Sequence, residues 1–294
     1  MAKLRRSLLF IPGGVEKMIR KAQDLTNADA IVLDLEDSVQ PANKDGARAA
    51  VTRVLAEPWV VDRDVGVRIN SLDTEWAIDD LRAVVPSRPS FLFVPKCESA
   101  IQIAFLEGAL RVLAAPNPPP ELIITLETAR GILRAEELAG MSALVTGLVF
   151  GAADLMRNTG GESTLLLEEL DYPRLHVVLA ATAAGIASFD VAYYEELANL
   201  EALEAQSVRG RRMGFKGKCV IHPSHLPVVN RVFSPSPEAI AEAREVLAAY
   251  AEGAASGKGA IRVRNRMIDA PMVEQARRTV SLAADLERRS SSAD

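Results

Sequence analysis

Hydrophobic residues in this chain fall into short runs, and each run is followed by a stretch with helical spacing of apolar positions. Runs such as Leu122–Leu126 and Leu148–Phe150 are bounded by turn residues, which is typical of strands buried on both faces. The pattern predicts eight strand-then-helix units, with strands at residues 7–11, 30–35, 65–69, 91–94, 122–126, 148–150, 187–192 and 218–221. We therefore predict an α/β fold, a TIM (β/α)₈ barrel. A doubly wound sheet usually needs fewer units, and no G-x-G-x-x-G follows a strand.

Two segments between the later strands affect how the site is placed. A helix is expected over residues 130–138, and residues 157–163 are expected to form a polar loop.

The barrel is predicted to span residues 1–233. Residues 234–294 are predicted to form a C-terminal helical extension or lid, which would pack on a neighbouring subunit.

This C-terminal part combines helical and flexible patterns. Helices are expected over residues 237–251 and 271–286, with a flexible Gly/Ser/Lys segment at residues 253–259 and an extended piece at residues 260–268. The flexible segment is what makes this part a candidate lid or arm.

Composition narrows the class of protein. Hydrophobic residues make up 49% and charged residues 25% of the chain, and the formal net charge is −5 with scattered basic residues, so a nucleic-acid partner is not expected. No apolar run approaches the roughly 20 residues of a membrane span, and the N-terminal run reaches Pro12 too soon for a signal peptide. We expect a cytoplasmic protein in which Cys97 and Cys219 are buried, reduced thiols.

The predicted strand ends carry an excess of acids. In a parallel barrel, the carboxyl ends of all strands lie at one face, where such enzymes place their chemistry. Glu127 and Asp154 each follow a buried run, and their all-oxygen character suits Mg²⁺ rather than Zn²⁺. The alternative is that they are surface acids or pair with nearby bases such as Arg130 or Arg157.

Other strand-end residues are candidates for binding or catalysis. Arg68 lies on a buried strand and needs an acid such as Glu36, or a substrate carboxylate, as partner. Glu36 is a catalytic candidate beside Arg68, and Lys96 is expected to form an ion pair with these acids rather than a Schiff base. Asp190 is interpreted as structural. The residues before Asp154 are candidate substrate contacts: Gly151, Ala152 and Ala153.

Two further regions offer charged groups. Gly13-Gly14 precede a predicted helix that carries Arg20 and Lys21, an arrangement that could bind a phosphate or form a basic solvent face. Asp269 lies beyond the flexible segment, where it could be delivered to a site as a catalytic group or serve only as a turn residue.

A set of motifs in fixed order covers about residues 5–285. The motifs are RSLLFIPG, VLDLEDSV, VRIN, VPK-x-ES, LETARGIL, FGAADL, GFKGKCVIHPSHL and MIDAP. With them the chain resembles the citrate lyase beta-subunit-like proteins, including malyl-CoA and citramalyl-CoA lyases, of the HpcH/HpaI aldolase superfamily. The chain departs from the usual family pattern at Asn265-Arg266 and at His225.

The resemblance implies specific roles. It implies that Glu127 and Asp154 hold Mg²⁺, that Arg68 binds the substrate carboxylate or keto oxygen, and that coenzyme A phosphates lie near Arg20 or Lys21. It also implies that Asp269 reaches the active site of a neighbouring subunit in a homo-oligomer, a trimer or hexamer.

The expected reaction is the Mg²⁺-dependent cleavage of a carbon–carbon bond in a 3-hydroxyacyl-CoA such as malyl-, citramalyl- or citryl-CoA. It yields a keto acid and an acyl-CoA, with Asp269 as the proton-transfer group. One alternative is an acyl-CoA thioester hydrolase. Another is a citrate lyase beta subunit that works only in a complex with an acyl carrier protein. The keto acid, whether glyoxylate, pyruvate or oxaloacetate, depends on the shape of the pocket.

Overall fold

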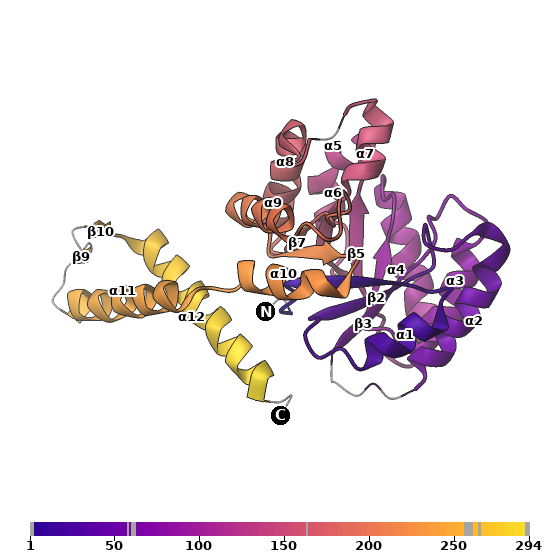
Figure 1. The fold of residues 1–294 in the computed structure, drawn as a ribbon, viewed down its shortest axis with the longest axis horizontal. Coiled ribbons are helices and arrows are strands. Elements are labelled where there is room, and N and C mark those ends of the chain that lie inside the picture. Colours follow the sequence, from indigo (N-terminus) through magenta and orange to yellow (C-terminus); the bar gives the residue numbers. More distant parts are fainter. Residues whose placement is uncertain are drawn as a thin grey trace. The chain divides into compact units, whose positions relative to one another are not determined.

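A computed structural model describes residues 3–57, 59, 63–162, 164–255, 261–263 and 266–291 of the chain. The chain divides into two compact units, residues 1–230 and residues 231–294. In the first unit, eight parallel strands close into a barrel in sequence order, with helices around the outside (Figure 1). The strands are β1 (Ser7–Pro12), β2 (Ala30–Asp34), β3 (Asp64–Arg68), β4 (Phe91–Val94), β5 (Glu121–Leu126), β6 (Val145–Phe150), β7 (Ala187–Asp190) and β8 (Gly217–Val220).

The helices between the strands cover the barrel wall. They are α1 (Glu16–Gln23), α2 (Lys44–Leu55), α3 (Ala77–Val84), α4 (Ala100–Ala114), α5 (Ala129–Leu133), α6 (Ala135–Gly140), α7 (Ala152–Thr159), α8 (Asp171–Ala183), α9 (Leu200–Met213) and α10 (Leu226–Val232). Short 3₁₀ turns occur at Pro41–Asn43, Val85–Ser87, Glu168–Leu170 and Pro223–His225. The predicted (β/α)₈ barrel with C-terminal helices is confirmed.

Alternate residues of each strand fill the barrel interior. This core is apolar and consists of Leu8, Ala30, Val32, Phe91, Phe93, Ile123, Val149, Ala187, Phe189 and Cys219. Gly66 makes room for a large neighbour, because a β-carbon there would lie 2.3 Å from the Phe91 ring. Since side chains alternate along a strand, the residues that continue this inward series beyond the core point into the mouth of the barrel.

Several boundaries differ from those expected, and three of the differences lie within residues 130–163. The helix predicted over residues 130–138 is two helices, because the backbone of Arg134 leaves helical geometry between α5 and α6. The sixth strand begins at Val145 rather than Leu148. The polar loop predicted from residue 157 is wrong at its start: α7 occupies this stretch and ends at Gly160, whose left-handed backbone (φ 72°) caps the helix.

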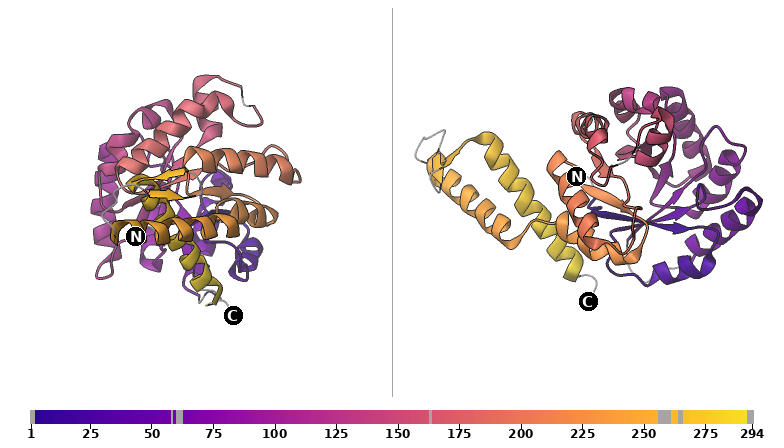
Figure 2. Two further views of the ribbon diagram at one scale, coloured as in Figure 1. Left: turned by 90° about the vertical axis from the view of Figure 1, so that its left-hand side faces the viewer. Right: turned by 45° about the horizontal axis from the view of Figure 1, so that its top comes forward.

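The C-terminal unit has a core of its own. Helices α11 (Pro237–Ala255) and α12 (Ala270–Ser291) lie side by side, joined through the antiparallel strands β9 (Ile261–Val263) and β10 (Arg266–Ile268) (Figure 2). Residues from all four elements form the core: Ala243, Val246, Val263, Ile268, Val273 and Ala276. The predicted flexible segment lies outside the described residues after residue 255, and α11 runs four residues further than residue 251.

Both cysteines are buried and free. Burial raises the pKa of Cys97 and of Cys219 to about 12, so both thiols stay protonated near neutral pH. No helix in the described part of the chain is long and apolar enough to cross a membrane.

Candidate active site

A cavity of about 470 Å³ opens at the carboxyl ends of the strands. Acids and Arg68 line one part of it, and aromatic and aliphatic side chains line the rest. The lining residues are Phe10, Pro12, Asp34, Asp37, Ser38, Arg68, Phe93, Thr125, Glu127, Val149, Phe150, Gly151, Ala152, Ala153, Asp154, Val191, Ala192, Tyr194, Cys219 and Ile221. The structure therefore brings together Arg68, Glu127, Asp154 and the three small residues before Asp154, as the strand-end hypothesis predicts.

Arg68 is fixed at the mouth by its neighbour in the barrel. Asp34 and Arg68 are the last residues of β2 and β3 and are paired in register. The guanidinium binds the Asp34 carboxylate through two of its three nitrogens, with Nε–Oδ1 at 2.6 Å and Nη2–Oδ2 at 2.7 Å. Burial alone would raise the pKa of Asp34, but the charge and hydrogen bonds of Arg68 outweigh it and hold the pKa below its ordinary value. Arg68 is thus a permanent, oriented positive charge.

Glu36 bridges the two cations of the site. Its Oε2 lies 2.9 Å from Nη1 of Arg68, and its Oε1 accepts a hydrogen bond of 2.5 Å from Nζ of Lys96. Burial raises the pKa of Glu36 in spite of these two positive charges. The ion pair expected for Lys96 is present, and Arg68 has acid partners in Asp34 and Glu36.

The loop that carries Glu36 is held from behind by Lys44. Nζ of Lys44 donates hydrogen bonds to the backbone oxygens of Leu35 (2.7 Å) and Glu36 (2.8 Å) and to Oδ1 of Asn70 (2.6 Å). Asn70 is fixed in turn by Asp80, which accepts from both its backbone and its side-chain nitrogen. Burial lowers the pKa of Lys44 although several acids surround it. One buried cation therefore sets the position of the catalytic candidate Glu36.

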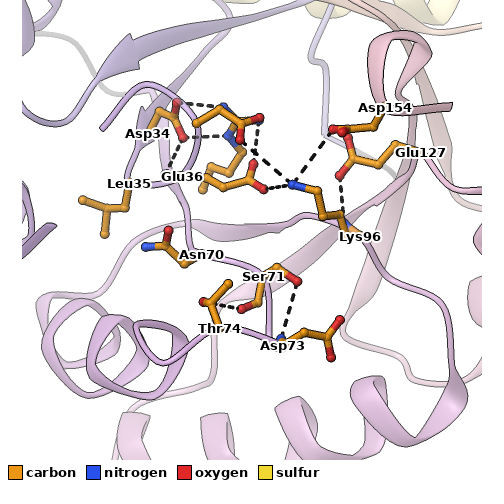
Figure 3. Close-up of polar contacts among 12 residues, drawn as sticks. Asp34, Leu35, Glu36, Asn70, Ser71, Asp73, Thr74, Lys96, Glu127 and Asp154 are labelled. Carbon is orange, nitrogen blue, oxygen red and sulfur yellow. Dashed lines mark hydrogen bonds and ion pairs between the residues drawn. The ribbon is translucent and has the colours of Figure 1, made fainter. Parts of the chain in front are cut away.

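Glu127 and Asp154 lie side by side beyond β5 and β6 (Figure 3). The backbone N–H of Lys96, held in a left-handed conformation (φ 51°), donates to Oε1 of Glu127 at 2.8 Å. A β-carbon at Gly151 would lie 2.4 Å from Cβ of Glu127, so only glycine fits beside this carboxylate. Burial, with the nearby charges of Glu36 and Asp154, raises the pKa of Glu127 to about 7.

The two carboxylates suit a hard divalent cation. Mg²⁺ binds oxygen ligands, commonly one or two carboxylates completed by water and substrate oxygens. Glu127 is buried beside other acids with a single backbone donor described on its carboxylate, and a cation would relieve the repulsion that raises its pKa. No group of three or more His, Cys, Asp or Glu side chains arranged as metal ligands occurs among the described residues. Water and substrate oxygens would have to complete the coordination.

Arg157 is the nearer of two basic partners of Asp154, the other being Lys96, whose Nζ lies 4.0 Å from Oδ2 of Asp154. Arg157 and Asp154 form an ion pair, as the alternative hypothesis anticipated, but the Arg157 side chain is 77% exposed and can swing into solvent. Arg130 pairs with Glu98 at 3.7 Å and not with Glu127. The pairing alternative therefore applies to Asp154 alone, and an exposed arginine is weak competition for a cation.

Two of the remaining candidates, Arg20 and Lys21, are not among the residues that line the cavity, and the third, Asp269, belongs to the other compact unit. Arg20 is committed to Glu16 and Glu57 through hydrogen bonds of 2.7–3.3 Å, whereas Lys21 is exposed beside it. Asp269 belongs to the C-terminal unit, where Oδ1 accepts from the backbone N–H of Met272 at 3.4 Å and caps α12. Its predicted role in a neighbouring active site stays a prediction.

Sequence reasoning assigned no role to several residues that shape the site. Asp34 stands inside an apolar run, yet as the last residue of its strand it could have been matched with Arg68 on the next. Thr125 lies two residues before Glu127 and so shares its inward face. Lys44 lies 8 residues after Glu36, and no local pattern shows that its side chain folds back onto the backbone there.

Comparisons with known proteins place the chain among enzymes of related chemistry. Residues 6–223 match the model of the family described as HpcH/HpaI aldolase/citrate lyase. The chain is 34% identical to citrate lyase subunit beta of Escherichia coli K12, covering 96% of this chain and 94% of the relative. It is 34% identical to the mitochondrial citramalyl-CoA lyase of Homo sapiens (97% and 87% covered). It is 36% identical to the (3S)-malyl-CoA thioesterase of Cereibacter sphaeroides (95% and 94% covered).

The structure is also similar to a solved one with bound ligands. The CitE protein from Mycobacterium tuberculosis, in complex with magnesium, acetoacetate and coenzyme A, superposes with a TM-score of 0.79. It is 31% identical in sequence, and the match covers 96% of this chain and 98% of that one.

Proposed function

The chain belongs to the HpcH/HpaI aldolase/citrate lyase family, and we propose that it is a Mg²⁺-dependent carbon–carbon lyase. Its substrate is a 3-hydroxyacyl-CoA thioester, which it cleaves into a 2-keto acid and an acyl-CoA. The observation that carries this proposal is the pair Glu127 and Asp154 beside Arg68 in one cavity of about 470 Å³. The named lyase relatives and the magnesium and coenzyme A in the CitE complex support it.

Each group of side chains has a separate role in this proposal. Glu127 and Asp154 would hold Mg²⁺, which when bound supplies Lewis-acid stabilisation of substrate oxygens. Arg68, held by Asp34 at 2.6 and 2.7 Å, presents a fixed positive charge toward the oxygen on which negative charge develops. Glu36 binds both Arg68 and Lys96, so that the charge of Arg68 is oriented before substrate arrives.

Proton transfer is assigned to Asp269 of a neighbouring copy in a homo-oligomer. Asp269 is exposed and belongs to the C-terminal unit, which has its own core and a long helix on each side of the β9–β10 hairpin. A mixing experiment tests this assignment. Asp269→Asn and Glu127→Ala proteins, each inactive alone, should recover activity when they form mixed oligomers, because one wild-type site then combines both groups. Failure of mixed oligomers to recover activity would remove the shared site.

The experiment for the reaction is product analysis with purified malyl-, citramalyl- and citryl-CoA and Mg²⁺. A lyase releases a keto acid with an acyl-CoA, whereas a hydrolase releases the free hydroxy acid with coenzyme A thiol. Hydrolysis is the second candidate because a malyl-CoA thioesterase is among the relatives. Free coenzyme A with malate or citramalate as the sole products would replace the lyase by the thioesterase.

The third candidate is a subunit that acts only with an acyl carrier protein, since a citrate lyase beta subunit is among the relatives. Turnover of coenzyme A esters by the isolated chain would exclude that dependence.

Lys21 is the better candidate for a coenzyme A phosphate, because Arg20 is already paired with Glu16 and Glu57. Lys21→Ala should raise KM for coenzyme A esters and leave KM for the matching pantetheine esters unchanged. An equal effect on both esters would argue against a phosphate contact.

A further inference from the structure

The cavity of about 470 Å³ is charged along one part of its lining and apolar along another. Its acids and Arg68 come from β2, β3, β5 and β6 or from the residues that follow these strands. The strands β7, β8 and β1, which pair in that order, supply an apolar wall. The apolar wall consists of Phe10, Pro12, Val191, Ala192, Cys219 and Ile221. A substrate held at the charged part therefore shares the cavity with a large surface that carries no charge.

The apolar wall begins directly at Arg68. Cζ of Arg68 lies over the Phe10 ring, 5.2 Å from its centroid, and the rings of Phe10 and Phe93 meet edge to face at 5.0 Å. Arg68 is the single cation among the described residues that line the cavity, and Asp34 and Glu36 already bind it. A carboxylate placed beyond the reach of Arg68 would therefore meet no counter-charge from this lining. Its uncharged polar side chains are Ser38, Thr125 and Tyr194.

The charge of the site stays negative even with a divalent cation bound. Five acids surround Arg68 and Lys96 and leave three negative charges, of which Mg²⁺ would balance two. The acids are Asp34, Glu36, Asp37, Glu127 and Asp154. Each further negative charge on the substrate adds to this excess, and like charges brought together away from water weaken binding strongly. The metal and Arg68 can hold one carboxylate, whereas a second one is repelled.

We propose that the keto acid of this enzyme is a monocarboxylate with a small uncharged side group, of the glyoxylate or pyruvate type, and that oxaloacetate is excluded. The thioester is then of the malyl or citramalyl type and not of the citryl type. This inference rests on the proposed function, because it takes Glu127 and Asp154 as the metal ligands that hold the 2-oxo-carboxylate unit. Wherever the side group lies, it meets either the apolar wall, which favours a methyl group, or the acids, which repel a carboxylate.

The test separates the charge of the side group from its size. Oxaloacetate carries a carboxymethyl group, and 4-methyl-2-oxopentanoate carries an isobutyl group of nearly the same shape without the charge. Calorimetry with Mg²⁺ and the full wild-type chain measures the Kd of both compounds and of pyruvate. We expect oxaloacetate to bind roughly a hundredfold more weakly than pyruvate, and the isobutyl compound to stay within about tenfold of pyruvate.

Ile221→Lys adds a cation to the apolar wall. Ile221 follows β8, lines the cavity and is 40% exposed, so a lysine there can reach the cavity without entering the barrel core. This variant should strengthen the binding of oxaloacetate relative to pyruvate by roughly tenfold. Ile221→Met has a similar length and no charge, and as the matched control it should keep the wild-type ratio of the two Kd values. Melting temperatures of both variants check that the barrel is intact.

Three binding results would overturn the proposal. Oxaloacetate might bind wild type as tightly as pyruvate does, the isobutyl compound might bind as weakly as oxaloacetate, or Ile221→Lys might leave the ratio unchanged. The second result would show that size and not charge excludes oxaloacetate. Efficient cleavage of citryl-CoA would also overturn the selectivity and leave the lyase function standing. Selective binding of pyruvate by a chain that cleaves no thioester would instead remove the proposed function and leave the selectivity.

Discussion

Two strand-end aspartates, Asp34 and Asp190, make the same contact and have opposite surroundings. Each binds an arginine: Asp34 binds Arg68 at 2.6 and 2.7 Å, and Asp190 binds Arg174 at 2.8 and 3.3 Å. Asp34 continues the inward series of β2 and lines the cavity. Asp190 follows the inward Phe189 and so points out toward the helices, where its side chain is 0% exposed and also contacts Lys218 at 3.2 Å.

The difference between these clusters is one of charge balance and access. Asp190 offers one negative charge to two buried cations, and Gln206 completes the contacts of Lys218 at 2.7 Å. The mouth of the barrel has an excess of negative charge, because five acids surround Arg68 and Lys96. The acids are Asp34, Glu36, Asp37, Glu127 and Asp154. An excess of acids that opens on a cavity can bind a cation that enters from solvent, whereas an enclosed network of ion pairs connects structural elements. The interpretation of Asp190 as structural agrees with its burial.

The largest effect is expected when one of the acids at the mouth of the barrel is removed. Asp154→Ala should lower Mg²⁺-dependent turnover roughly a thousandfold, because several kcal/mol of charge stabilisation depend on the bound cation. Calorimetric Mg²⁺ titration and steady-state rates measure the change. Asp45→Ala, which removes a 94% exposed acid from α2, is the control and should behave like wild type. Wild-type turnover in the Asp154 variant would end the metal hypothesis.

The same kind of change at Asp190 should affect stability instead. Asp190→Asn leaves Arg174 and Lys218 buried without a counter-charge, which should lower the free energy of unfolding by about 3–5 kcal/mol. Denaturant titration of the purified variant measures it, and kcat per folded molecule should be retained. A variant of wild-type stability with impaired catalysis would erase the distinction between the two aspartates.

Part of this contrast could be predicted from the sequence, and part could not. Apolar runs gave the order of the strands and the face at which Glu127 and Asp154 meet. The sequence does not show which strand residues point into the barrel and which point toward the helices. Strands such as AIVLD and ASFD are buried on both faces, so polar and apolar residues do not alternate along them. Helix α7 was missed because its eight residues follow directly on a strand and include Asn158 and Thr159, which favour turns. No local pattern links Lys44 to the backbone behind Glu36.

A pH series sharpens the electrostatic side of the comparison. The pKa of Glu127 is raised to about 7 in the folded chain, from an ordinary value of 4.5. Because the unfolded chain ionises at the lower pH, the free energy of unfolding falls as the pH rises from about 4.5 to about 7. The loss is absent below this range and complete above it. In metal-free buffer, Glu127→Gln should therefore gain stability relative to wild type as pH rises from 5 to 8, by at most about 3 kcal/mol. Thermal unfolding across the series measures the trend. A constant difference between the two proteins would show that Glu127 is already ionised at pH 5.

The smallest effect concerns the exposed partner of Asp154. Arg157→Ala removes a solvent-exposed ion pair, so Mg²⁺ affinity should rise by no more than about threefold and stability should hardly change. Calorimetry at low and at high salt measures the gain, which should vanish at high salt. A tenfold loss of Mg²⁺ affinity would instead make Arg157 part of the binding site.

The two cysteines give the chain an internal reporter of its own opening. A thiol reagent reacts with the thiolate, and because burial raises both pKa values to about 12, neither Cys97 nor Cys219 is ionised in the native barrel near neutral pH. The rate of alkylation at Cys97 then measures how often the barrel opens, whereas Cys219 can also be reached through the cavity that it lines. Since Cys219 lines the cavity and Cys97 does not, a ligand that slows labelling of Cys219 more than of Cys97 would report occupancy of the site without any assay of turnover.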